Sequence, residues 1–133
     1  MGTLIDTGVL IAAERGHIDP EQLVEEPDSE RAAIAAITAS ELLHGVYRLK
    51  PSIKRARAER FVEGILAAFP VVAFDLAIAR IHAQLEAHLA ATGTAIGAAD
   101  LQIAATAVAL DYRIATRDLR SFPKIRGLHV VRW

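Results

Sequence analysis

Near its N-terminus the chain reads Thr3-Leu4-Ile5-Asp6-Thr7-Gly8-Val9-Leu10-Ile11, an apolar strand that passes through one acidic residue into an apolar helix. Further short apolar runs follow, and helical segments separate most of them. The expected strands are residues 3–6, 32–37, 71–74, 113–116 and 129–131. Since none of them alternates apolar with polar residues, both faces of each strand should be buried. We therefore predict an α/β fold with one parallel sheet covered by helices on both sides.

Turn and capping signals delimit the helices. A helix should run from Thr7 to about Arg15, and Pro20 should open a short helix through Glu26, which Pro27 ends. Residues 38–41 read Thr-Ala-Ser-Glu, the spacing of a capping box, so we expect the next helix to begin at Thr38. The remaining helices are expected from residue 51 to about 68, from 75 to about 91, and from about 98 to 110.

The composition restricts the class of protein. A length of 133 residues suits a single domain spanning 1–133, and 53% hydrophobic residues suffice for a core without disulfides. The absence of cysteine excludes disulfides and thiolate zinc sites. No stretch approaches the ~20 apolar residues that span a bilayer, and the N-terminus lacks a signal-peptide pattern. We therefore expect a cytoplasmic protein.

The net charge of -1 conceals two cationic regions. The first contains Arg48, Lys50, Lys54, Arg55, Arg57 and Arg60, and the second contains Arg113, Arg117, Arg120, Lys124, Arg126 and Arg132. Each region is either a solvated surface or a surface for a polyanion. The candidates for contact with a nucleic-acid backbone are Arg48, Lys50, Lys54, Arg55, Arg57 and Arg117.

Four acidic residues occupy similar places in this scheme. Asp6 ends the first strand, and Asp118 follows the strand at 113–116. Glu41 should lie in the first helical turn after the second strand, and Asp100 in the first turn of the helix at 98–110. In open parallel sheets, ligands bind beyond the carboxyl ends of the strands. We therefore expect these four side chains to converge on one crevice.

Each acid also has a purely structural explanation. Asp6 and Asp118 suit helix N-caps, Glu41 would complete its capping box, and Asp100 would favour the helix dipole. Clustered carboxylates, however, raise one another's pKa unless a cation compensates. Oxygen ligands without cysteine or paired histidine fit Mg²⁺ or Mn²⁺ better than zinc. Such a site favours phosphoryl chemistry, in which one or two cations activate and orient a water.

Four blocks of sequence resemble the motifs of PIN-domain proteins, and most of all those of the VapC toxins of bacterial toxin–antitoxin pairs. They are Leu-Ile-Asp-Thr-Gly-Val-Leu-Ile at 4–11, Thr-Ala-Ser-Glu-Leu-Leu-His-Gly at 38–45, Gly-Ala-Ala-Asp at 97–100 with Ile-Ala-Ala-Thr-Ala at 103–107, and Thr-Arg-Asp-Leu-Arg-Ser-Phe at 116–122. The blocks appear in the order expected for the family and span nearly the whole chain.

The resemblance implies a five-stranded parallel sheet, Mg²⁺- or Mn²⁺-dependent endoribonuclease activity, a homodimer, and neutralisation by a small VapB-type antitoxin. It carries Asp6, Glu41, Asp100 and Asp118 over as catalytic and metal-binding residues. Two positions depart from the family. Gly8 stands where Ser is frequent, and Ser121 stands where many members have a further Asp before Phe. The last block therefore contributes only one acid, Asp118, which would bind the metal directly or through water. Thr116 provides a hydroxyl two residues before it.

Other classes of protein fit less well. A receiver or phosphatase-like domain also places acids at strand ends, but Asp6 has no acidic neighbour, and Arg117 stands where a receiver would have lysine. A PIN domain that serves only as a binding module would be expected to lose acids, and four remain. The Glu-x-x-His pattern at 41–44 occurs in di-iron bundles, which need a second copy. A phosphate-binding glycine loop with lysine is absent from the sequence.

Overall fold

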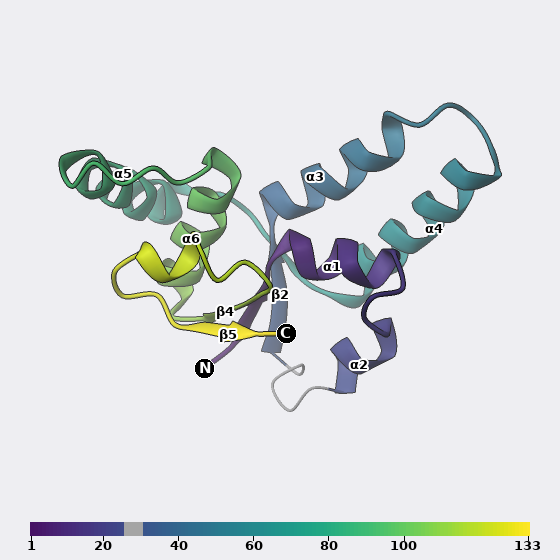
Figure 1. Cartoon of the computed structure of the whole chain (residues 1–133), viewed down its shortest axis with the longest axis horizontal. Helices are drawn as coiled ribbons and strands as arrows, with labels where there is room; N and C mark the ends of the chain where they lie inside the picture. The colour runs from purple at the N-terminus through teal and green to yellow at the C-terminus, as the bar shows by residue number, and fades with distance from the viewer. Residues whose placement is uncertain (26–30) are drawn as a thin grey trace.

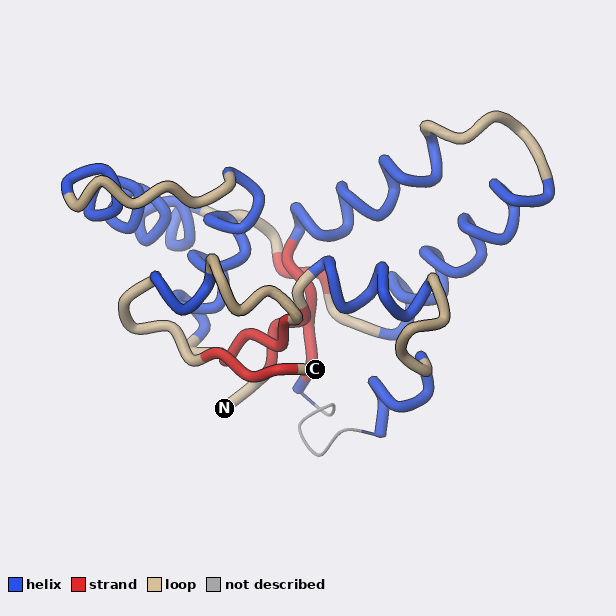
Figure 2. The backbone as a smooth tube through the Cα atoms, viewed as in Figure 1, coloured by secondary structure: helices blue, strands red, loops and turns tan. Residues whose placement is uncertain are grey.

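The strands form one parallel sheet with the order β3-β2-β1-β4-β5 in a computed structural model that describes residues 1–25 and 31–133. Its strands are β1 (Thr3–Ile5), β2 (Ala32–Ala35), β3 (Val71–Val72), β4 (Arg113–Thr116) and β5 (Val130–Arg132). The predicted α/β class is thus confirmed. Figure 2 shows the strands gathered in the middle of the molecule with helices around them.

The helices are α1 (Thr7–Glu14), α2 (Pro20–Glu25), α3 (Ala36–Tyr47), α4 (Ile53–Ala68), α5 (Leu76–Ala91), α6 (Ala98–Leu110) and the short 3-10 helix η2 (Phe122–Lys124). In Figure 1, α3 and α4 project as a hairpin on the right, while α5 and α6 lie on the left. None of the helices in the described segments has the length and apolar character needed to cross a membrane.

Two apolar cores cover the sheet, because successive strand residues face opposite sides. Ile5 and Ile34 belong to the core that α1, α3 and α4 complete. Leu4 and Ala33 belong to the core on the other face, which receives Ile103 from α6 and Phe122 from η2. Double-sided burial is the physical reason that these strands show no polar alternation.

Several predicted boundaries are confirmed by the structure. Helix α6 and strand β4 cover the expected residues. Asp75 caps α5, since its Oδ1 accepts a hydrogen bond from the Ile78 backbone N–H at 2.9 Å. Ser52 caps α4 in the same way through the N–H of Arg55. The predicted end of α2 at Glu26 and Pro27 lies outside the described residues.

The predicted boundary between the second strand and its helix is wrong. Strand β2 ends at Ala35, and α3 already begins at Ala36 without a capping side chain on Ala35. Thr38 therefore lies inside the helix, and Glu41 is in its second turn rather than its first. A short apolar run cannot be divided into strand and helix by periodicity alone, and alanine favours the helix. Strand β3 is also shorter than predicted, and β5 begins one residue later.

Candidate active site

The acidic site, defined as Asp6, Glu41, Asp100 and Asp118, lies at the carboxyl ends of β1 and β4. These two strands are neighbours, although the chain leaves β1 toward β2 on the other side. The sheet order therefore switches direction between them, which is where ligands bind in open parallel sheets. Helices α3 and α6 bring Glu41 and Asp100 to the same end of the sheet.

Asp6 is the most deeply placed of the four, with only 5% of its surface exposed. Its Oδ2 accepts a hydrogen bond from the Thr116 hydroxyl at 2.7 Å. Although Asp6 is at the N-cap position of α1, its side chain makes no capping hydrogen bond with that described helix. Burial raises the pKa of Asp6 from 3.8 to about 6, opposed by the Thr116 hydroxyl and reinforced by Asp100 and Asp118. A simple cap does not explain this carboxylate.

Asp100 connects the remaining acids electrostatically. Burial raises its pKa, and the negative charges of Asp118 and Glu41 raise it further. The negative charge of Asp100 also raises the pKa of Asp6. Each of the four predicted residues therefore interacts electrostatically with at least one of the others. Within the described part of the chain, Asp100 has no hydrogen-bond donor to stabilise its charge.

Glu41 is fixed by a hydroxyl pair that sequence reasoning did not identify. The Thr7 hydroxyl donates to Glu41 Oε1 at 2.8 Å and also lies 3.0 Å from the Thr38 hydroxyl oxygen. Thr7 and Thr38 are buried, whereas Glu41 is exposed. The sequence shows a threonine directly after Asp6, but it does not show that α1 packs against α3. That packing brings Thr7 and Glu41 together.

Asp118 has a structural role in addition to its place near the other acids. Its Oδ1 accepts the backbone N–H of Arg120 at 2.8 Å and that of Ser121 at 3.2 Å. These bonds, chiefly the one from Arg120, lower the pKa of Asp118. Its own backbone N–H donates to the Thr116 hydroxyl at 2.9 Å. Thr116 therefore links Asp6 and Asp118.

The donor chemistry fits a hard divalent cation, because every candidate ligand is a carboxylate oxygen. In the segments that the structure describes, no three acidic or histidine side chains are already arranged to hold an ion. The acids thus act on one another's charge without yet enclosing an ion. Two glycines lie against the acids, since a Cβ on Gly8 would lie 3.6 Å from Asp6 Oδ2 and one on Gly97 would lie 3.7 Å from Asp100 Oδ2.

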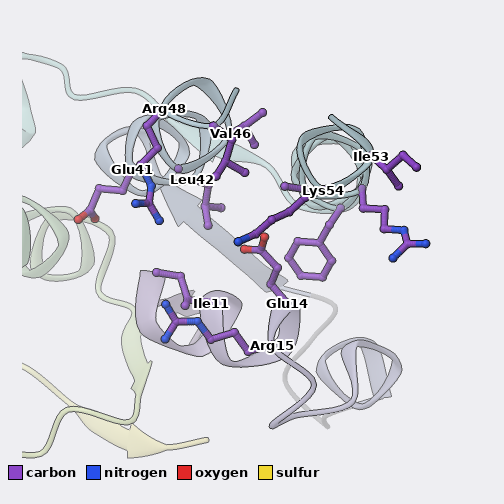
Figure 3. Close-up of a pocket in the computed structure, with 14 residues that line it drawn as sticks. Ile11, Glu14, Arg15, Glu41, Leu42, Val46, Arg48, Ile53 and Lys54 are labelled. Atoms are coloured by element: carbon purple, nitrogen blue, oxygen red, sulfur yellow. The ribbon is translucent and has the colours of Figure 1, made fainter. Parts of the chain in front are cut away.

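A groove of about 720 Å³ adjoins the acidic site between α1 and the α3–α4 hairpin (Figure 3). Leu42 and Val46 of α3 contribute to its apolar lining. Arg48, Lys54 and Arg57 add positive charge to it. Glu41 belongs to the lining of the same groove, which therefore reaches the acidic site.

Arg55, another candidate for nucleic-acid contact, is partly occupied within the fold. Its guanidinium donates to the backbone carbonyl of Leu49 at 3.2 Å and so fastens the turn between α3 and α4. Lys50 is exposed in that turn, and Arg117 is exposed directly after β4. The predicted nucleic-acid contacts therefore lie in two places, on the α3–α4 hairpin and beside Asp118.

Known proteins resemble this chain over nearly its whole length. The family model described as "PIN domain" matches residues 3–128. A ribonuclease VapC from Rickettsia bellii is 34% identical over 131 residues, covering 98% of this chain and 96% of the relative. A tRNA(fMet)-specific endonuclease VapC from Salmonella typhimurium is 30% identical over 132 residues, with coverage of 98% and 96%. The solved structure of DNA-bound VapBC from Salmonella typhimurium superimposes with a TM-score of 0.89 at 27% identity, covering 100% of this chain and 98% of that chain. The chain belongs to the PIN-domain family, as a protein of the VapC type.

Proposed function

We propose that this chain is a divalent-metal-dependent endoribonuclease, the toxin of a VapBC-type pair, which hydrolyses RNA phosphodiester bonds. The observation that carries the proposal is the electrostatic coupling of four carboxylates at the switch point between β1 and β4. Similarity over nearly the whole chain to proteins named ribonuclease VapC supports RNA as the substrate.

Asp6, Glu41, Asp100 and Asp118 would hold Mg²⁺ or Mn²⁺. When bound, such a cation neutralises like charges, lowers the pKa of a water and stabilises charge on the phosphoryl oxygens. The raised pKa values of Asp6 and Asp100 support this assignment, because they indicate carboxylates whose charge the protein does not fully compensate.

The residues of the chain have distinct parts in this mechanism. Thr116 holds the buried Asp6 in one orientation, and Thr7 does the same for Glu41. Asp100, which accepts no hydrogen bond from the described protein groups, is free to accept one from the attacking water and so to orient it.

The cations at the margins of the acidic site would hold the RNA backbone. On the hairpin, the contributing residues are Arg48, Lys50, Lys54, Arg55 and Arg57, and beside Asp118 it is Arg117. Among them, Arg48, Lys54 and Arg57 line the groove that also contains Glu41, which supports a path for RNA toward the acids. Arg55 is the weakest candidate, because its guanidinium is already bound to Leu49.

The proposed partners are a VapB-type antitoxin and a second copy of the chain, in the cytoplasm. The neighbouring solved structures include VapBC from Rickettsia felis and Salmonella typhimurium, which supports an antitoxin of that type. Phe74 and Leu76 are 41% and 66% exposed at the start of α5, beside edge strand β3, which supports a surface that a dimer would cover. Light scattering should give twice the chain mass for the isolated protein, and a monomer at micromolar concentration would contradict the dimer.

Cleavage of RNA by the purified protein tests the proposal. Wild-type activity should disappear in EDTA and return with Mg²⁺ or Mn²⁺. The variants Asp6→Asn and Asp100→Asn should be folded and inactive, while Asp111→Asn, which alters an exposed acid at the end of α6, should retain activity. Full activity in EDTA, or in Asp100→Asn, would overturn the metal assignment. Sequencing of the 5′ ends of the fragments would identify the RNA and the cleavage motif.

A further inference from the structure

A second hollow lies beside Asp118, separate from the groove on the α3–α4 hairpin. This hollow, which we call the arginine depression, has a volume of about 660 Å³ and is open to solvent. Its lining consists of Arg117, Asp118, Leu119, Arg120, Ser121 and Arg132. The first five residues follow β4, and the last one ends β5.

The pairing of β4 with β5 brings the third arginine to the other two. Arg132 is the register partner of Thr116, the residue whose hydroxyl contacts Asp6. The loop that carries Arg117 and Arg120 begins directly after Thr116. The three arginines therefore surround the end of the strand that supports the acidic site.

The lining of the arginine depression carries a net positive charge, because it contains three arginines and one acid, Asp118, whose charge Arg120 stabilises. Three exposed arginines face one carboxylate, Asp118, whose Oδ1 already accepts two backbone N–H groups. Throughout the described residues, no ion pair involves any of the three arginines, and the ion pair found is His82 with Glu86. Three neighbouring cations repel one another, so an anion of matching geometry would stabilise this arrangement.

The acidic site is contiguous with both cationic surfaces. Glu41 belongs to the lining of the hairpin groove, and Asp118 belongs to the lining of the arginine depression. Asp100 is coupled to both of these carboxylates. A strand bound to both surfaces would therefore pass Glu41 and Asp118, which each belong to one of the two linings.

We propose that the arginine depression binds a backbone phosphate of single-stranded RNA adjacent to the scissile phosphate. This inference rests on the proposed function and adds a second anchoring point for the strand. Guanidinium groups bind phosphate oxygens through paired hydrogen bonds, which fixes the position of the backbone without reading the base. Leu119, 49% exposed in the same lining, offers an apolar contact to the sugar or base of that nucleotide.

The test measures RNA binding in EDTA, so that no cleavage occurs. The variant Arg120→Gln/Arg132→Gln removes two cations from the depression, and Arg31→Gln/Arg80→Gln removes two exposed cations elsewhere. With a single-stranded oligonucleotide, the first variant should lower the log–log salt slope by about 0.7 for each phosphate that it no longer neutralises. The control variant should leave the slope unchanged. Equal slopes for both variants would overturn the inference.

A neutral linkage locates the bound phosphate on the RNA. Methylphosphonate is introduced at one position at a time on either side of the cleavage site. One position on the side of the depression should weaken wild-type binding, and Arg120→Gln/Arg132→Gln should show no further weakening there. If the two effects are additive at every position, the depression does not bind that phosphate.

The two proposals can fail separately. If wild type cleaves RNA while Arg120→Gln/Arg132→Gln binds it with unchanged affinity and salt slope, the inference is wrong and the proposed function stands. Weakened binding of the antitoxin alone would assign the depression to the partner protein and also overturn the inference. If wild type neither binds nor cleaves RNA, both proposals are wrong.

Discussion

The hydroxyl of Thr116 donates a hydrogen bond to Asp6 Oδ2 at 2.7 Å, although the two residues are 110 positions apart in the sequence. The same hydroxyl accepts the backbone N–H of Asp118. One side chain therefore fixes the buried acid that follows β1 and the loop that follows β4. This arrangement makes Thr116 a positioning residue for the acidic site.

Replacing Thr116 with Val should reduce RNA cleavage strongly while the protein stays folded. The substitution leaves the carboxylate of Asp6 without its donor, which should cost about 1.5–3 kcal/mol near neutral pH. Thr116→Ser keeps the hydroxyl and should retain most activity. Thr106→Val is the matched control, since Thr106 is similarly buried but donates to the backbone carbonyl of Gln102. Equal activity of the two Val variants would contradict the assigned role.

Removing the Thr7 hydroxyl should weaken metal activation more than folding. In Thr7→Val, Glu41 loses the hydrogen bond that orients it, so the Mg²⁺ or Mn²⁺ concentration for half-maximal activity should rise. A hydrogen bond to a charged group contributes about 1.5 kcal/mol, so its loss should raise this metal concentration roughly tenfold. Thr7→Ser should restore the wild-type value. An unchanged metal dependence in Thr7→Val would mean that Glu41 needs no such support.

The stability of the metal-free protein should fall as the pH rises from 5 to 7. Because the pKa of Asp6 is raised from 3.8 to about 6, the folded state holds this proton more tightly than the unfolded chain. Stability from this group is therefore fully present below about pH 4 and is lost as the pH passes 6, by about 1–2 kcal/mol between pH 5 and 7. The raised pKa of Asp100 also makes stability fall as the pH rises. The pKa of Asp118 is lowered, so its contribution to stability is lost only at acid pH.

Urea unfolding in EDTA at pH 5, 6 and 7 measures this effect. Asp6→Asn should show a much flatter pH dependence than wild type. If both proteins lose the same stability over this range, the uncompensated charge of Asp6 is not the cause.

Replacing Asp100 with Asn should raise the melting temperature of the metal-free protein. Burial and the charges of Asp118 and Glu41 oppose the ionised form of Asp100, and the amide removes that charge at nearly constant shape. Mg²⁺ or Mn²⁺ at a hundredfold excess over Kd should stabilise wild type by roughly 2.7 kcal/mol and the variant by much less. If Asp100 only favoured the helix dipole, the substitution would instead lower the metal-free melting temperature. Thermal melts with EDTA and with metal distinguish these results, and Glu63→Gln, which alters an exposed acid in the middle of α4, should leave both melts unchanged.

The positions of the acids were predictable because they follow from sheet geometry. Asp6 and Asp118 come after apolar runs, and the carboxyl ends of parallel strands meet at one edge. Helix α6 was predictable because glycines precede it and its apolar residues continue to Leu110.

The hydrogen bonds that position the acids were harder to predict from the sequence. The hydroxyl pair of Thr7 and Thr38 depends on how α1 packs against α3, and the capping-box pattern at 38–41 pointed instead to a local role. Asp118 caps a turn and its charge also raises the pKa of Asp100. Its structural and its functional explanation therefore hold together. Local patterns could not reveal either relationship, since each depends on side chains from distant elements.

The position of β1 between β2 and β4 has a consequence for synthesis. A ribosome makes Asp6 110 residues before Thr116. Until β4 emerges, one edge of β1 has no partner, and the buried acid lacks both its hydroxyl and the Asp118 loop. Long-range pairing of this kind also slows folding. A nascent chain of this proposed nuclease would therefore lack an assembled acidic site until the residues of β4 have left the ribosome that translates its message.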